Sequence, residues 1–193
     1  RGLVAFIDIA YQGFADGINE DAQVLQLFAA SGVQFLVASS FSKSFSLYGE
    51  RVGALSVVAA SKDEAARVMS QVKRVVRANY SSPPTHGGAV VAAVLGSPEL
   101  RQMWEEELGQ MRQRILAMRV SLVDKLQGRG VGIDFSFVTR QRGMFSYTGL
   151  GAGQVDRMRD ELGIYAVSTG RICLAALNTN NIDYVADAIA AVL

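Results

Sequence analysis

Two short apolar runs separated by a helical pattern constrain the fold of this chain more than any other feature. Val4–Ile9 and Val33–Ala38 are mainly apolar over the length of a strand, and residues 21–31 between them have the pattern of a helix. Runs of this kind are typical of strands that are covered on both faces, as in parallel sheets. We therefore predict an α/β fold that contains part of a parallel sheet.

The following segments extend the α/β pattern. We predict a third strand at Leu55–Ala59 and an amphipathic helix over residues 63–78, with Lys73 on its outer face. Apolar residues recurring at helical spacing indicate the face that packs inward. On this helix they are Ala66, Met69, Val72 and Val76.

One long helix divides the chain. Pro98–Leu126 is a single amphipathic pattern, and Ser97 before it is the predicted N-cap. A helix of this length commonly connects two units, so we place the domain boundary within it and predict domains at residues 1–112 and 113–193. We expect the second domain to be a small α/β unit. Its predicted elements are an alternating segment around Phe135–Val138, a strand at Met144–Tyr147, a helix at Gly153–Leu162, a strand at Arg171–Leu177 and a helix from Ile182.

Composition narrows the classes of partner. The sequence is 50% hydrophobic with a net charge of +1, which permits a sizeable core and gives no reason to expect nucleic acid or a charged membrane surface. No apolar run reaches membrane-spanning length. The single cysteine, Cys173, excludes an internal disulfide and fits a reducing, cytoplasmic compartment. With His86 as the only histidine, no zinc site can be completed, so we expect no metal.

One lysine lies where a covalent cofactor anchor would be expected. Lys43 lies in a serine-rich loop after the second apolar run, while Asp8 and Tyr11 lie at the C-terminal end of the first. Open α/β sheets bind ligands at this end of their strands. Pyridoxal phosphate is held as an imine by a lysine, and an acidic partner keeps its ring nitrogen protonated. Lys43 would be the anchor, Asp8 the partner of the ring nitrogen and Tyr11 a donor to the ring oxygen.

The same loop contains candidate phosphate ligands. Ser40 supplies a hydroxyl, and Arg51 supplies a guanidinium fork that matches two phosphate oxygens. Each residue also has a simpler interpretation. A lysine between two strands is commonly a solvated surface residue, and an aspartate that ends a strand commonly forms a turn or caps a helix. The ordered combination favours a cofactor site over these separate explanations.

Six motifs that include these residues follow one another along the chain: Asp8–Phe14, Ser40–Lys43, Tyr48–Gly53, Arg77–Pro84, Gly143–Leu150 and Gly170–Ala175. In this order they resemble the class I pyridoxal-phosphate aminotransferases, specifically the aspartate and aromatic amino-acid (tyrosine) branch. The resemblance implies the fold type I architecture, with residues 1–112 as the C-terminal part of the large, cofactor-binding domain and residues 113–193 as the small domain. It also implies pyridoxal 5'-phosphate as the cofactor.

The resemblance assigns roles to three further residues. Arg171 matches the arginine that binds the substrate α-carboxylate, and Phe145 matches an aromatic residue that lines the substrate pocket. Arg77 matches an arginine that crosses the interface of a homodimer to the side-chain carboxylate, so each active site would be shared between two subunits. The simpler alternatives are a surface arginine, a core aromatic and a cation favoured by a helix C-terminus, respectively.

The resemblance also defines the expected reaction and what is missing. Complete family members are roughly twice as long, so the chain resembles a C-terminal half, and the isolated piece is expected to be inactive without its N-terminal half. The complete enzyme would transfer an amino group between an aromatic or acidic amino acid and a 2-oxo acid such as 2-oxoglutarate, in amino-acid biosynthesis, with Lys43, Asp8 and Tyr11 as catalytic residues. Two alternatives stay open: a non-catalytic regulator that senses pyridoxal phosphate, and an inert fragment.

Overall fold

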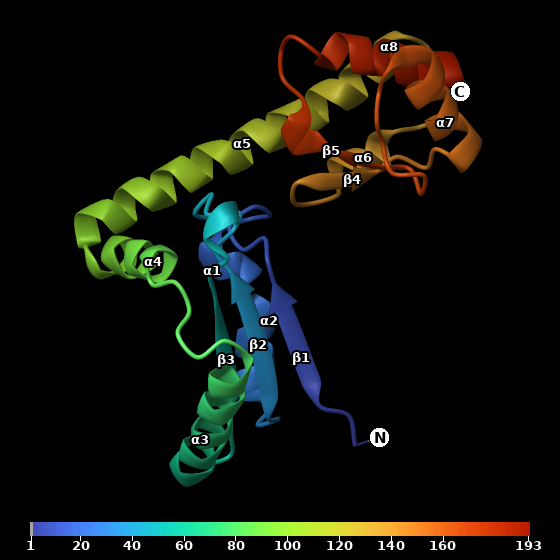
Figure 1. Ribbon diagram of the computed structural model, residues 1–193. Coiled ribbons are helices and arrows are strands. Elements are labelled where there is room, and N and C mark those ends of the chain that lie inside the picture. The colour runs from blue at the N-terminus through green and yellow to red at the C-terminus, as the bar shows by residue number, and fades with distance from the viewer. Residues whose placement is uncertain (1) are drawn as a thin grey trace. The chain divides into compact units, whose positions relative to one another are not determined.

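The computed structural model describes residues 2–193 as two units (Figure 1). The first unit runs to Gly13 and resumes over Gly17–Leu108, and the second comprises Phe14–Asp16 and Gly109–Leu193. The division falls within one long helix, α5, Pro98–Gly128, which confirms the predicted helix. Ser97 caps it, because its Oγ accepts a hydrogen bond from the Leu100 amide at 3.3 Å. The assignment of residues 1–112 and 113–193 to a large and a small domain stays a prediction.

The first unit contains a mixed three-stranded sheet in the order β1-β2-β3. Its strands are β1, Ala5–Ile9, β2, Phe35–Ser40, and β3, Gly53–Val58. β1 and β2 pair in parallel and β2 and β3 antiparallel, so the sheet is not wholly parallel. A parallel return to β3 would usually need a crossover helix that packs on the face of the sheet. Residues 41–52 instead form the lysine loop and turn the chain directly back.

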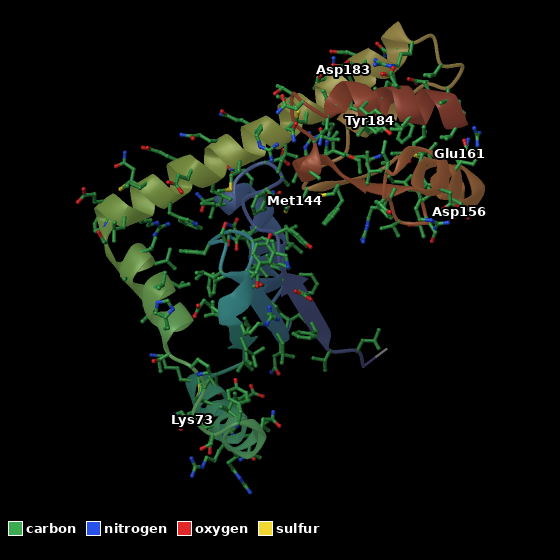
Figure 2. All side chains as sticks on the ribbon, turned by 45° about the horizontal axis from the view of Figure 1, so that its top comes forward. Lys73, Met144, Asp156, Glu161, Asp183 and Tyr184 are labelled. Atoms are coloured by element: carbon green, nitrogen blue, oxygen red, sulfur yellow. The ribbon has the colours of Figure 1, made fainter. Side chains whose placement is uncertain are left out.

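Helices flank the strands of the first unit along the chain. The crossover between β1 and β2 is made by α1, Ile18–Asp21, and α2, Gln23–Ala30. The lysine loop contains a 3-10 turn, η1, Tyr48–Glu50, and two helices follow β3: α3, Lys62–Asn79, and α4, His86–Gly96. The predicted helix over residues 63–78 is therefore confirmed, and Lys73 on α3, labelled in Figure 2, is exposed as predicted.

The predicted burial of the first unit is wrong in two places. Phe6 of β1 is 64% exposed, and none of the five residues of this strand, all of them described, is buried. Met69 of α3 is 54% exposed, although its helical spacing places it on the apolar face. Both patterns predicted an apolar face correctly, but no described segment buries either face.

The second unit packs helices around a two-stranded antiparallel sheet. After α5 come α6, Ser136–Thr139, β4, Phe145–Tyr147, α7, Ala152–Leu162, and β5, Arg171–Cys173, followed by η2, Leu174–Ala176, and α8, Ile182–Val192. β4 pairs with β5 from Phe145 opposite Cys173 to Tyr147 opposite Arg171. The helices α7 and α8 and the strand β4 confirm the predicted order.

Two predictions for the second unit need correction. The alternating segment around Phe135–Val138 is not a strand but the helical turn α6, because Asp134 accepts hydrogen bonds from both the amide and the hydroxyl of Ser136 and so starts the turn. The strand predicted at Arg171–Leu177 ends at Cys173, where the chain enters η2. Among the helices of the described residues, none combines the length and apolar character needed to cross a membrane.

Candidate active site

The C-terminal ends of β1 and β2 bring the candidate lysine and a tyrosine together. Because the two strands are parallel, with Ile9 opposite Ser39, the residues that follow them emerge at the same edge of the sheet. The Nζ of Lys43 lies 5.0 Å from the ring centroid of Tyr11. It also lies 5.6 Å from the ring centroid of Tyr48, a residue that the sequence analysis did not select.

The Lys43 side chain is held without an acidic partner. It is half-buried, and within residues 2–193 it forms no ion pair with a carboxylate. The two tyrosine rings instead present their negative faces to the ammonium group, which is a weaker constraint than a salt bridge.

The backbone of the lysine loop is a tight, locally hydrogen-bonded turn. The Phe45 amide donates to the Phe41 carbonyl at 3.2 Å, and the Ser46 amide donates to the Lys43 carbonyl at 3.1 Å. The Ser42 amide donates to the Ser40 hydroxyl at 3.2 Å. Ser46 adopts a left-handed conformation with φ 54°, which is uncommon for a residue other than glycine. The loop is therefore constrained on both sides of Lys43.

The two candidate phosphate ligands lie at opposite ends of this loop and are brought close by strand pairing. Ser40 is the last residue of β2 and lies opposite Gly53 of β3, two residues after Arg51. A Cβ atom at Gly53 would lie 2.6 Å from the Ser39 carbonyl oxygen, so only glycine permits this pairing. Arg51 ends η1 in a left-handed conformation, and its guanidinium donates to the Tyr48 carbonyl at 3.0 Å.

Asp8 is positioned by the strand rather than by a partner side chain. It lies within β1 opposite Ala38 of β2, three residues before Tyr11. Its side chain belongs to the exposed face of β1, together with Phe6. The strand therefore presents a carboxylate on the same chain segment that delivers Tyr11 to Lys43.

A second group of candidate residues lies in the second unit. The guanidinium carbon of Arg171 lies 5.0 Å from the ring centroid of Phe145, because Arg171 starts β5 and Phe145 starts its partner β4. Arg171 is exposed and, in the part of the chain that the structure describes, makes no ion pair. Stacking on an aromatic ring orients the planar fork while leaving its donors available for a carboxylate.

Arg77 lies in the last turn of α3 in the first unit. Its Nη1 donates to the Ser81 hydroxyl, and Ser81 itself has a left-handed backbone with φ 58°. Both the helix C-terminus and this hydroxyl favour a cation here. The described contacts of Arg77 thus fit the simpler interpretation as well as the functional one, and its role stays a prediction.

Two residues near the loop were not assigned to the site from the sequence. Trp104 of α5 donates from its indole nitrogen to the Ser44 carbonyl at 2.6 Å, next to Lys43 in the chain. Tyr48 lies beside the Lys43 ammonium group. The sequence offered one usable signal for Tyr48, its place between Lys43 and Arg51 in the same loop, and none for Trp104, which is sixty residues from Ser44.

The donor set fits an aromatic phosphorylated cofactor better than a metal ion. No cluster of three or more histidine, cysteine, aspartate or glutamate side chains that could hold a metal occurs among residues 2–193. The residue types fit the parts of pyridoxal phosphate: Lys43, which has no carboxylate partner in the described chain, could hold the imine, and a carboxylate follows on β1. A hydroxyl and a guanidinium, at the two ends of the lysine loop, could bind the phosphate.

Comparison with known proteins identifies the family. The model of the family described as aminotransferase class I and II matches residues 1–189. Over the whole chain, the sequence is 65% identical to an aspartate aminotransferase from Pseudomonas aeruginosa and 53% identical to an aromatic-amino-acid aminotransferase from Escherichia coli. The chain covers 48% and 49% of these two relatives, so it spans about half their length.

A solved structure agrees in fold over the whole chain. An aromatic-amino-acid aminotransferase from Burkholderia pseudomallei, described as covalently bound to pyridoxal phosphate, superposes with a TM-score of 0.97 at 68% identity. The match covers 100% of this chain and 48% of that structure. Relatives with aspartate and with aromatic names are both present, so the resemblance found in the motifs is confirmed at the level of the family. The chain belongs to the class I and II aminotransferases and has their fold type I architecture.

Proposed function

We propose that this chain is the C-terminal half of a pyridoxal-phosphate-dependent aminotransferase. The complete protein exchanges an amino group between an aromatic or acidic amino acid and a 2-oxo acid such as 2-oxoglutarate. The observation that carries the proposal is the position of Lys43, which lies between the rings of Tyr11 and Tyr48 at the C-terminal ends of two parallel strands, with no acidic partner in the described chain. The family match and the covalently bound cofactor of the similar Burkholderia structure support it.

The residues of the first unit would hold the cofactor. When bound, the cofactor supplies an aromatic ring that accepts electrons from the substrate carbon. Lys43 would provide the covalent anchor, and its free amine would move a proton at the substrate α-carbon. Asp8 holds the proton on the ring nitrogen, and Tyr11 donates to the ring oxygen. Ser40 and Arg51 bind the phosphate through a hydroxyl and a guanidinium fork.

Arg171 and Arg77 would divide the recognition of the substrate. Arg171, oriented by its stacking on Phe145, binds the α-carboxylate that every amino acid carries. Arg77 binds the side-chain carboxylate of acidic substrates from the partner subunit of a homodimer. Arg171 also favours amino-group transfer over cofactor sensing, since a sensor has no need for an oriented site for a substrate carboxylate.

The branch of the family is part of the proposal. The residues of Arg77–Pro84 and Phe145–Leu150 resemble the aromatic (tyrosine) type more than the strict aspartate type. Specificity constants of the full-length protein for aspartate, phenylalanine and tyrosine test this preference. Aspartate exceeding both aromatic substrates by orders of magnitude would overturn it. We also propose a cytoplasmic location and a role in amino-acid biosynthesis, which fractionation of the source cells and growth of a deletion strain would test.

The anchor is tested in the full-length protein by Lys43→Ala. Removing the amine should abolish the absorbance of the borohydride-reducible imine between lysine and cofactor. Turnover should fall by several orders of magnitude, because the anchor and the proton carrier are lost together. Borohydride reduction followed by peptide mapping should place the cofactor on Lys43. Lys73→Ala, on an exposed position of α3, is the matched control and should retain both signals. Cofactor attached to Lys62, Lys73 or Lys125 would contradict the assignment.

A further inference from the structure

An aromatic residue on α5 is tied to the lysine loop by two independent contacts. The indole nitrogen of Trp104 donates to the Ser44 carbonyl at 2.6 Å. The Trp104 ring also stacks on Phe45, with ring centroids 4.5 Å apart and planes inclined by 18°. Both residues contacted by Trp104 follow Lys43 directly in the chain. The contact therefore acts on the backbone that carries the lysine, although Trp104 itself does not touch the Lys43 side chain in the described contacts.

The loop held by Trp104 has a conformation that needs support. Ser46 has φ 54°, a left-handed conformation that costs energy for a residue with a side chain and persists where surrounding contacts hold it. Phe45, the stacking partner of Trp104, also makes an edge contact with Phe41 at 5.5 Å between ring centroids. Trp104 thus anchors an aromatic cluster that brackets Lys43 on both sides, from Phe41 to Phe45.

Open space beside the loop makes this anchor necessary. A cavity of about 250 Å³ is bordered by Ser40, Ser44, Phe45 and Trp104. A loop next to such a cavity can shift into it when a restraining contact is removed. The ammonium group of Lys43 lies 5.0 Å from one tyrosine ring and 5.6 Å from another, so a shift of the loop changes its position and its charge environment.

We propose that Trp104 is a positioning residue for Lys43, and that the bond from its indole nitrogen to the Ser44 carbonyl fixes the place from which the lysine acts. This inference rests on the proposed function, because it assigns Trp104 a part in the reaction of Lys43. A misplacement of about 1 Å in a reacting group can cost about two orders of magnitude in rate. A role limited to core packing requires the ring stack but not the bond to the carbonyl, and this difference makes the two roles separable.

The test uses Trp104→Phe in the full-length protein loaded with cofactor. This change keeps an aromatic ring on Phe45 and removes the indole donor. The matched control is Tyr184→Phe, which removes an aromatic donor that bonds a backbone carbonyl, that of Leu162, at the same distance of 2.6 Å but in the second unit. Tyr184 is labelled at the start of α8 in Figure 2. The measurements are kcat, KM, the melting temperature and the pH midpoint of the absorbance of the bound cofactor.

In Trp104→Phe we expect the cofactor still to be trapped on Lys43 by borohydride. kcat should fall about threefold to tenfold, the range that corresponds to the net value of one hydrogen bond, while KM changes by less than about twofold. The pH midpoint of the cofactor absorbance should move by about half a unit or more, because the anchoring nitrogen sits differently between the tyrosine rings. Tyr184→Phe should lower the melting temperature by a similar amount and leave kcat and the pH midpoint unchanged.

Equal kcat values and equal pH midpoints in Trp104→Phe and Tyr184→Phe would overturn the inference and leave a packing role. Should Trp104→Phe fail to fold, site-specific replacement of Trp104 by benzothienylalanine carries the same test, since this residue keeps the bicyclic ring on Phe45 and removes only the N–H donor; wild-type kcat and pH midpoint in that variant would overturn the inference. A wild-type protein that takes up no cofactor on Lys43 would overturn the proposed function itself. Cofactor on Lys43 combined with an unaffected Trp104→Phe overturns only the role of Trp104.

Discussion

The two units bury their apolar side chains to very different extents. In the second unit, α8 alone contributes five buried residues, Ile182, Ala186, Ala188, Ile189 and Val192. In the first unit, none of the 18 described residues of α3 is buried, and Phe6, Leu27 and Leu55 are 64%, 65% and 52% exposed. Large exposed apolar faces mark surfaces that contact further protein. The second unit therefore has a core of its own, whereas the first presents faces that need cover from outside the described residues.

The second unit is closed tightly enough to bury a cation. Arg119 of α5 is 1% exposed, and its guanidinium donates to the carbonyls of Gln141, Gly143 and Phe145. Its Nε has no hydrogen-bond partner among the described atoms, and burial, followed by the nearby charge of Arg142, lowers the pKa of Arg119. These bonds fix the backbone that enters β4. The strand that carries Phe145 beneath Arg171 is therefore supported from within the second unit.

This difference in packing parallels a proposed division of chemical roles. The first unit carries the reactive part, Lys43 in its loop, together with the residues assigned to the cofactor. The second unit carries Arg171, oriented by Phe145 on a well-packed two-stranded sheet. A group that recognises a feature common to all substrates is best placed on a rigid element.

Among the variants that compare the two units, the largest expected effect separates their arginines. In the full-length protein, Arg171→Leu should reduce kcat/KM for aspartate, phenylalanine and tyrosine alike, by about a hundredfold or more, because each substrate loses the partner of its α-carboxylate. Arg77→Leu should reduce kcat/KM for aspartate and glutamate by a similar factor and spare phenylalanine and tyrosine. Specificity constants for both variants measure this.

Arg74→Leu supplies the control for this comparison. Arg74 lies on α3 three residues before Arg77, is exposed and forms no ion pair within the described chain, so all four specificity constants should stay at wild-type values. If Arg77→Leu lowered all four constants equally, Arg77 would support the fold or the dimer, and its assignment to the side-chain carboxylate would have to be dropped.

Two methionines test the difference in packing directly. Met158 of α7 is 0% exposed and Met69 of α3 is 54% exposed. In the 193-residue chain, Met158→Ala should lower the free energy of unfolding of the second unit by about 2–5 kcal/mol, because it leaves a cavity in a closed core. Met69→Ala should change the free energy of unfolding of the first unit by less than about 0.5 kcal/mol. Urea unfolding followed by hydrogen exchange of each unit measures both values.

The same pair becomes informative in the full-length protein. If further chain or a partner covers α3, Met69→Ala should become more costly there than in the 193-residue chain, while the cost of Met158→Ala stays the same. An equal, small cost of Met69→Ala in both forms would mean that this face stays exposed, and the contrast between the two units would then be intrinsic to the protein.

The sequence predicted elements whose signals are local. The helices α5, α7 and α8 follow from apolar periodicity, and the start of α5 follows from Ser97 as its cap. The alternating segment near Phe135 forms a helical turn because Asp134 starts the turn there, and this local hydrogen bonding outweighs two-residue alternation. The antiparallel direction of β3 depends on how residues 41–52 fold, which no local pattern shows.

The site was predictable to the extent that its residues share short motifs. Lys43 and Tyr11 are brought together because each follows one of two paired parallel strands, a relation that a strand–helix–strand pattern implies. Trp104 could not be found in this way, because its bond to Ser44 spans sixty residues. The burial of the first unit was mispredicted because an apolar pattern shows which face packs but not whether the packing partner lies in the same segment.

The smallest expected effect concerns an ion pair on the surface of the second unit. Lys125 of α5 contacts the carboxylate of Asp183, labelled on α8 in Figure 2, at 2.6 Å, and Arg129 contacts it at 3.5 Å. The hydrogen bond from Lys125, with further help from Arg129, lowers the pKa of Asp183.

A carboxylate whose pKa is lower in the folded state stabilises the fold above its unfolded pKa of about 3.9 and loses this contribution as the pH falls through the folded value. Asp183→Asn should therefore lower the melting temperature slightly at pH 7, and the difference from wild type should decline as the pH falls below about 4 and shrink in high salt. The control is Asp124→Asn on α5, an exposed residue without an ion pair in the described chain. A difference for Asp183→Asn that did not decline as the pH was lowered from 7 to 3 would show that the side chain acts by capping or packing on α8 and not by its charge.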